Sequence, residues 1–287
     1  FLKNVQIVHI SYGNYEARNE NGSPIVNLLP LAALQDWTFA AADYLHNGQS
    51  EQLVQLTKNA ITPILKATLG KDEGANSLKK LFTTLETITS NMQTCRGLPI
   101  TQEDDVFKLK QSIESSSADI IPPLVPVIKE IEKSFSNFSA DANTINGLHA
   151  AKWCYKNRMY QQAITILQET IVTMVCEKTN LPIENKNARG LVNSAFKIVF
   201  KKKQNDEDSW SLKYESRDEA VEIVRELIQL PIINDLSSSF FVATELRNDF
   251  NHAGFRDNPQ DVDKIIKSIG ERIQKVYNIL IPQTDVH

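Results

Sequence analysis

The sequence is poor in cysteine and contains no long apolar run. Its three cysteines, Cys95, Cys154 and Cys176, lie far apart, with no CxxC pair and no nearby histidines at metal-ligand spacing. We therefore expect buried free thiols in a reducing cytoplasm. No stretch approaches the roughly 18 to 20 consecutive apolar residues that span a bilayer, and the N-terminus lacks the pattern of a signal peptide. No membrane association is expected.

An excess of positive charge is also missing. Lysine and arginine number 31 against 35 aspartate and glutamate residues, which gives a net charge of -4 over 287 residues. No global basic field therefore draws the chain onto nucleic acid or an anionic membrane, and any contact with nucleic acid must be local. The length and the 41% hydrophobic content suffice for one large core or two modest ones.

A β-prone stretch occupies residues 3–12, where apolar and polar side chains alternate up to Gly13. A lone strand cannot satisfy its backbone hydrogen bonds. It must either pair with the short run at residues 24–28 or belong to a larger sheet. The chain begins with Phe1 and not with methionine, which favours the larger sheet and an upstream part of the protein.

From Pro30 onward the apolar residues recur with a period of about 3.6, which predicts helices to the end of the chain. Proline, glycine and serine clusters mark the breaks between them. The expected helices cover residues 30–46, 50–69, 74–93, 102–115, 123–137, 143–157, 160–179, 185–201, 216–229, 234–251 and 259–280. The polar stretch 202–214 is expected to be a mobile loop.

The segment Ser237 to Arg256 holds the candidate chemistry, because Arg247, Asn248 and His252 crowd near the end of its amphipathic helix. Five helical residues correspond to about 500° of rotation, so Arg247 and His252 point in different directions. Two arrangements could place such a pair in one cleft. The helix could end just after His252, or a twofold dimer could bring two copies of the segment together.

A plainer interpretation stays open beside the catalytic one: His252 caps the helix, and Arg247 forms an ion pair with Glu245 or Asp249.

Two further features have ordinary explanations. Residues 149–170 resemble one helical-repeat unit, but without a second copy a packed core hairpin is favoured. Lys201, Lys202 and Lys203 form either a solvated loop or a phosphate-gripping edge for RNA.

The motif LRNDFNH at residues 246–252 resembles the Arg-x4-His signature of HEPN ribonucleases. Three further blocks, in the same order, resemble the part of CRISPR-associated CARF-HEPN proteins (the DxTHG family) that follows their sensor domain. They are ISYGNYEAR at 10–18, SPIVNLLPLAALQDWTFAAADYLHNGQ at 23–49 and HAAKWCYKNRMYQQAITILQETIV at 149–172. The DxTHG signature itself is absent.

The resemblance implies an all-α, multi-helix HEPN-type bundle over residues 30–287. Residues 1–29 would be the last strand and exit linker of a missing CARF domain. By the same resemblance the chain is a cytoplasmic effector of type III CRISPR antiviral defence. Its HEPN part would be a homodimer with a composite active site, and cyclic oligoadenylate would act only through the missing sensor.

The implied activity is cleavage of single-stranded RNA without metal or cofactor. The 2'-OH attacks its own phosphate and leaves a 2',3'-cyclic phosphate, and the family pattern assigns this chemistry to Arg247, Asn248 and His252. The alternative from another class is a catalytically silent helical dimer that binds RNA or a protein.

Overall fold

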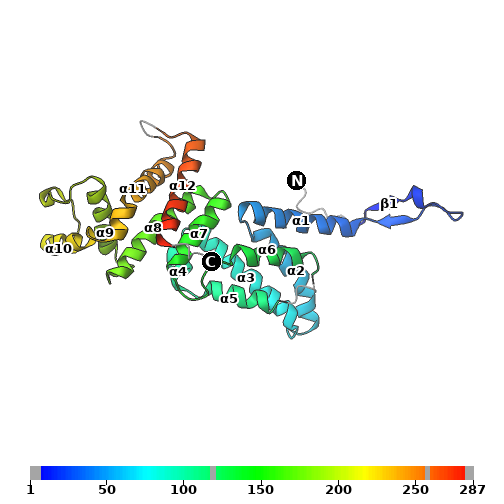
Figure 1. The fold of residues 1–287 in the computed structure, drawn as a ribbon. Coiled ribbons are helices and arrows are strands. Elements are labelled where there is room, and N and C mark those ends of the chain that lie inside the picture. The colour runs from blue at the N-terminus through cyan, green and yellow to red at the C-terminus, as the bar shows by residue number, and fades with distance from the viewer. Residues whose placement is uncertain (1–7, 117–120, 256–258, 282–287) are drawn as a thin grey trace, which may run out of the picture. The chain divides into compact units, whose positions relative to one another are not determined.

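The protein is described by a computed structural model that covers residues 8–116, 121–255 and 259–281 (Figure 1). Within these ranges the chain forms twelve α-helices and one two-stranded sheet, which confirms the expected all-α class. It divides into two compact units, Phe1–Glu86 with Gln111–Lys133 and Thr87–Lys110 with Ser134–His287. The expected assignment of residues 30–287 to one domain stays a prediction.

The first unit begins with an antiparallel hairpin. Strand β1 (Ser11–Gly13) pairs with β2 (Ile25–Asn27), so that Tyr12 lies opposite Val26. This is the local pairing that the sequence allowed as one of two arrangements. Half of the predicted strand, residues 3–7, lies outside the described residues, and membership of a larger sheet stays a prediction.

Helices make up the rest of the first unit. They are α1 (Leu29–Asn47), α2 (Glu51–Ala67) and most of α3 (Glu73–Gln93) and α6 (Leu124–Ser134). Helix α1 stops at Gly48, whose positive φ of 69° is accessible to glycine without a steric cost. Pro63 lies inside α2, and the helix continues past it.

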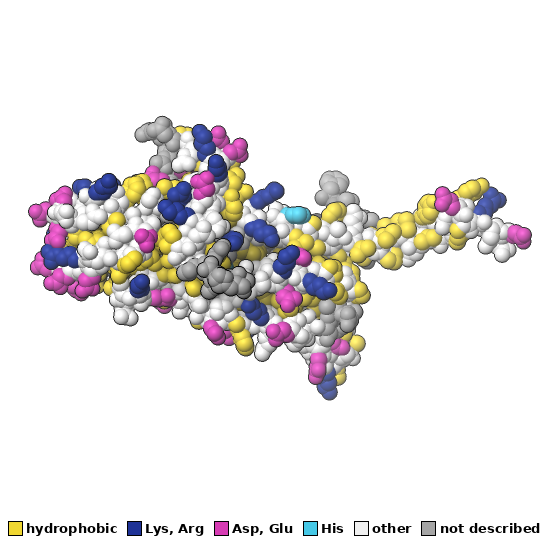
Figure 2. All heavy atoms as spheres, viewed as in Figure 1, with side chains coloured by type: hydrophobic (Ala, Val, Ile, Leu, Met, Phe, Trp, Pro, Cys, Tyr) yellow, Lys and Arg dark blue, Asp and Glu magenta, His cyan; other side chains and the backbone are white. Residues whose placement is uncertain are grey.

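Large hydrophobic side chains remain exposed on the hairpin and along α1 (Figure 2). Ile25, Leu31 and Phe39 are each more than half exposed. Contiguous exposed apolar surface is typical of interaction sites. No helix among the described residues is long and apolar enough to cross a bilayer.

The second unit is built around one buried helix, α8 (Tyr160–Lys178). Ten of its residues are buried, and it packs against α7 (Ile145–Lys156), α9 (Lys186–Phe200), α11 (Pro231–Asn251) and α12 (Val262–Leu280). This unit also contains α4 (Gly97–Gln102), α10 (Arg217–Leu227), the end of α3 and the first part of α5 (Asp105–Glu114).

Close contacts fix the neighbours of α8. Gly147 of α7 lies so close to Thr170 that a Cβ atom at this position would be 2.1 Å from the Thr170 hydroxyl oxygen. Between α9 and α11, the ring of Phe196 stacks on Phe240 with 4.1 Å between centroids. The hairpin of α7 and α8 is thus a packed core element, as the plainer interpretation of residues 149–170 predicted.

Two sequence-based expectations need correction. The helix expected over residues 102–115 is α5, and a separate helix, α4, precedes it because Pro99 lies in a first turn, where proline is tolerated. The loop at 202–214 is anchored. Trp210 is buried and donates its Nε1 hydrogen to the Lys203 carbonyl at 2.8 Å.

His149 on α7 makes the stability of the second unit depend on pH. Its ring contacts Phe138 and Tyr277, and burial, together with the charges of Lys152 and Lys110, lowers its pKa to about 4. Between this value and the ordinary pKa near 6.5, the unfolded chain binds the proton and the folded chain does not. Acidification through this window therefore favours unfolding.

We expect the melting temperature of the protein to fall more steeply between pH 7 and pH 4 than that of a His149→Gln variant. Calorimetry of both proteins across this range measures the difference. His46→Gln is the matched control, because His46 is exposed on α1. Parallel pH profiles for the protein and the His149→Gln variant would contradict this account.

Candidate functional site

Arg247 reaches its place at the site because α11 is anchored along α8. Pro231 occupies the first turn of α11, and Phe240 and Leu246 bury one face of the helix. One turn before Arg247, the Thr244 hydroxyl accepts a hydrogen bond of 2.8 Å from the side chain of Gln168 on α8. The arginine is thereby aimed at α8.

Glu169 on α8 binds Arg247 directly. One oxygen of its carboxylate, Oε1, lies 2.8 Å from the Arg247 guanidinium, and the other, Oε2, lies 2.7 Å from that of Arg189. The side chains of Arg247 and Arg189 are 28% and 20% exposed, so water screens these pairs only in part. The three side chains together carry one net positive charge.

Arg189 is the fixed end of this network. Its guanidinium donates to the Thr173 hydroxyl and to the Ile183 carbonyl, both at 2.9 Å, and to the backbone carbonyl of Glu169 at 3.1 Å. A residue held by this many bonds has one geometry. Arg189 therefore orients Glu169, and Glu169 orients Arg247.

A shallow groove of about 350 Å³ lies beside Arg247. We call it the Arg247 groove; it is lined by Gln93, Thr94, Cys95, Gln161, Gln162, Thr165, Arg247 and Asn251. Its lining side chains are mostly amides and hydroxyls, which both donate and accept hydrogen bonds. A guanidinium in such a setting is suited to bind a phosphate group.

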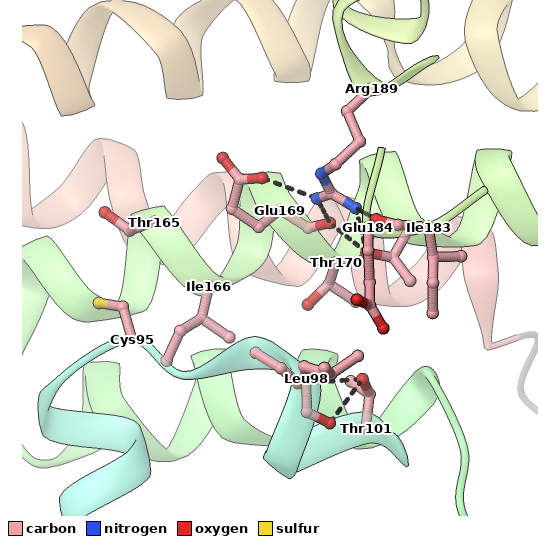
Figure 3. Close-up of a pocket in the computed structure, with 12 residues that line it drawn as sticks. Cys95, Leu98, Thr101, Thr165, Ile166, Glu169, Thr170, Ile183, Glu184 and Arg189 are labelled. Atoms are coloured by element: carbon pink, nitrogen blue, oxygen red, sulfur yellow. Dashed lines mark hydrogen bonds and ion pairs between the residues drawn. The ribbon is translucent and has the colours of Figure 1, made fainter. Parts of the chain in front are cut away.

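A second hollow of about 380 Å³ continues from the groove between α8 and α4 (Figure 3). We call it the α4–α8 pocket. Cys95 and Thr165 line both hollows, and Glu169 and Arg189 line the pocket. The Arg247 groove and the α4–α8 pocket therefore form one continuous surface along α8.

Asn248 and His252 lie on a different face from Arg247. Helix α11 ends at Asn251, His252 is its exposed C-cap, and Ala253 and Gly254 have positive φ values of 51° and 74°. The expected helix stop just after His252 is therefore present. Neither Asn248 nor His252 lines the Arg247 groove. In one copy of the chain, the groove joins Arg247 with Asn251 and leaves out the histidine.

The observed positions of Arg247 and His252 agree in part with each of the two interpretations of the motif. His252 occupies the helix cap, and Arg247 forms an ion pair, as the plainer interpretation expected, although the carboxylate comes from Glu169, 78 residues earlier. At the same time the guanidinium borders an open groove, as a catalytic site requires.

The three lysines remain separate from this site. Lys201, Lys202 and Lys203 are exposed after α9, and the Lys203 amino group lies 3.9 Å from the Asp206 carboxylate. Lys201 and Lys203 border a hollow of about 250 Å³ beside Trp210. Their role in binding RNA stays a prediction.

The thiol of Cys95 lines both hollows, one of them together with Arg247. Burial raises its pKa, the Arg96 charge lowers it, and the Glu169 charge raises it. The net rise keeps the thiol protonated near neutrality, and a protonated thiol is a poor nucleophile. Cys95 is therefore not a candidate nucleophile at this site.

Sequence reasoning missed Glu169 and Arg189. Neither belongs to the motif, and only the tertiary contact of α8 with α9 and α11 brings them to Arg247. Glu169 lies within the block at residues 149–172 that resembles the HEPN family. The one signal in the sequence was an acidic residue in the middle of a mostly apolar helical stretch.

Comparison with curated proteins relates the chain to a CRISPR-associated protein. No family model matches the chain. Over 190 residues, 65% of its length, the chain is 25% identical to the CRISPR-associated protein MJ1674 of Methanocaldococcus jannaschii. The matched stretch covers 27% of that protein, so the chain spans about a quarter of the relative's length. This chain is similar to part of a CRISPR-associated protein.

Proposed function

We propose that the chain is a metal-independent endoribonuclease of the HEPN type that cuts single-stranded RNA in CRISPR-based defence. One observation carries the proposal: Glu169 holds the Arg247 guanidinium at an open groove, and His252 ends the same helix five residues later. Similarity to a CRISPR-associated protein supports the biological setting.

The proposed reaction is a transesterification within the RNA. The 2'-oxygen attacks the adjacent phosphorus and gives its proton to a base, while the bond to the 5'-oxygen breaks and that oxygen takes a proton from an acid. The products are a 2',3'-cyclic phosphate and a 5'-OH. DNA lacks the nucleophile and is not a substrate.

His252 exchanges one of these protons, because imidazole is the side chain best suited to acid-base work near neutral pH. Arg247 stabilises the charge that builds on the phosphate oxygens. Glu169 binds its Nη1 and so holds the guanidinium beside the groove where the phosphate would lie. Asn248 lies one helical turn before His252 and orients either the histidine or the RNA.

We further propose a homodimer, since His252 and Arg247 of one copy point to different surfaces. A twofold axis near the end of α11 would place each histidine beside the partner's groove. Control by cyclic oligoadenylate would require a longer protein that carries a sensor domain.

One observation favours a second candidate, a catalytically silent dimer that binds RNA or a protein: the Arg247 guanidinium is already paired with the Glu169 carboxylate, as a purely structural arginine would be. The two candidates differ in one assay. Fluorescent single-stranded RNA is incubated with the chain in EDTA and analysed for cyclic-phosphate ends, which only the nuclease produces.

Removing the charge of Glu169 tests its part in this proposal. We expect Glu169→Gln to lower kcat about tenfold with little change in KM. Charge-assisted hydrogen bonds contribute about 1.5 to 3 kcal/mol, and a factor of ten corresponds to about 1.4 kcal/mol. Steady-state kinetics on a labelled RNA measures both constants.

The matched control is Glu226→Gln, because Glu226 is exposed on α10. It should match the unmodified protein. A higher rate for Glu169→Gln would show that the carboxylate restrains Arg247 and does not position it, and an unchanged rate would show that the pair is structural.

A further inference from the structure

The α4–α8 pocket has the size and the walls of a nucleobase site. Its volume of about 380 Å³ falls in the range of small-molecule pockets, which is roughly 300 to 1,000 Å³. Leu98 from α4, together with Ile166 and Ile183, contributes apolar surface, and apolar side chains can cover the faces of a base. The pocket opens into the Arg247 groove through the shared residues Cys95 and Thr165.

Its position relative to Arg247 suits RNA. Glu169 lines the pocket and also binds Arg247. An RNA strand whose phosphate contacts Arg247 therefore runs directly beside the pocket. Thr165, Glu169 and Thr173 are spaced by four along α8, and they follow one helix face for about 12 Å at 1.5 Å per residue. A nucleotide that flanks the bound phosphate can therefore reach the pocket.

The charges of the pocket exclude a phosphate and favour a hydrogen-bond donor. Arg189 is committed to Glu169, Thr173 and Ile183, so it presents no unpaired cation. Glu184 is exposed, and within the described residues its carboxylate forms no hydrogen bond or ion pair. Figure 3 shows this carboxylate directed toward the space between α8 and α4.

A carboxylate accepts two parallel hydrogen bonds when a ligand offers two adjacent donors. Guanine does so with N1–H and its 2-amino group, whereas the exposed edges of adenine, cytosine and uracil each offer one donor group next to an acceptor. Single-stranded RNA displays these edges because its bases are unstacked.

From this geometry we infer that the α4–α8 pocket binds a guanine base of the RNA strand. The guanine belongs to a nucleotide that flanks the phosphate at Arg247, and the Glu184 carboxylate accepts hydrogen bonds from its N1–H and 2-amino group. The inference rests on the proposed nuclease function, whose site it extends. It makes Glu184 a specificity-determining residue that takes no part in bond cleavage.

The test compares cutting of four RNA substrates. They are otherwise identical unpaired oligonucleotides that carry G, A, C or U on both sides of one cleavable position. We expect the protein to cut the guanine substrate at least about fivefold faster than the others, since this is the lower end of the discrimination that a bidentate base contact typically gives. Glu184→Gln should lose this preference and retain its rate on the other three, and Glu226→Gln should behave as the unmodified protein.

Binding of free guanosine separates this inference from the nuclease proposal. In a His252→Ala protein, titration with guanosine should shift the methyl signals of Leu98 and Ile183 in NMR spectra, and adenosine, cytidine and uridine should shift them less. Cleavage without a guanine preference, or a preference that survives Glu184→Gln, would overturn the inference and leave the nuclease intact. A protein that binds guanosine without cutting RNA would overturn the nuclease and keep the pocket.

Discussion

Replacing His252 by alanine is expected to lower the rate of RNA cleavage by about 10²- to 10⁴-fold, because this is the usual contribution of general acid-base catalysis. The side chain is exposed at the end of α11, so its removal leaves no cavity and the fold should persist. Single-turnover cleavage of a fluorescent RNA measures the rate, and circular dichroism measures the fold.

A matched histidine makes this experiment specific. His46 is exposed in the last turn of α1, as His252 is at the end of α11. His46→Ala should therefore retain full activity. Equal activity of the His252→Ala protein and the unmodified protein would remove the histidine from the proposed site.

Arg247→Ala should lower the cleavage rate to a similar extent, because it removes the cation that stabilises the negative charge developing on the phosphate. Arg247→Lys should restore only part of the rate, because lysine keeps the charge and lacks the planar fork. The fold should again persist: Glu169 keeps its bond to Arg189, so no carboxylate is left without a cation. Arg18→Ala, at an exposed arginine of the hairpin, is the control.

Mixing the two inactive proteins tests whether the site is shared. If each site draws on two copies, a dimer of one Arg247→Ala chain and one His252→Ala chain regains an arginine and a histidine in the same cleft. The mixture should then cut RNA measurably faster than either variant alone. A mixture that forms mixed dimers and remains inactive would contradict the composite site.

The helices were predictable because local chemistry determines where they begin and end. Pro30 and Pro231 lie in first turns, and Gly48 and Gly254 adopt positive φ at helix ends. Trp210 shows the opposite case. Its polar surroundings predicted a mobile loop, but the indole is buried and its Nε1 donates to the Lys203 carbonyl within the same loop. The polar residues around Trp210 do not signal this burial.

The candidate site was predictable only in part. Helical rotation indicated that Arg247 and His252 diverge, and the groove does pair Arg247 with Asn251, four residues on, and not with His252. Glu169 could not be found in this way, because its bond to Arg247 joins residues 78 positions apart. Local periodicity holds no information about such a pair.

The most direct test is the chemistry of the RNA ends. Labelled single-stranded RNA is incubated with the purified chain in EDTA, and the products are analysed by mass spectrometry. The nuclease proposal predicts 2',3'-cyclic phosphate and 5'-OH ends, absent with the His252→Ala protein. Intact RNA, or fragments with 3'-OH and 5'-phosphate ends that appear only when metal is added, would contradict it.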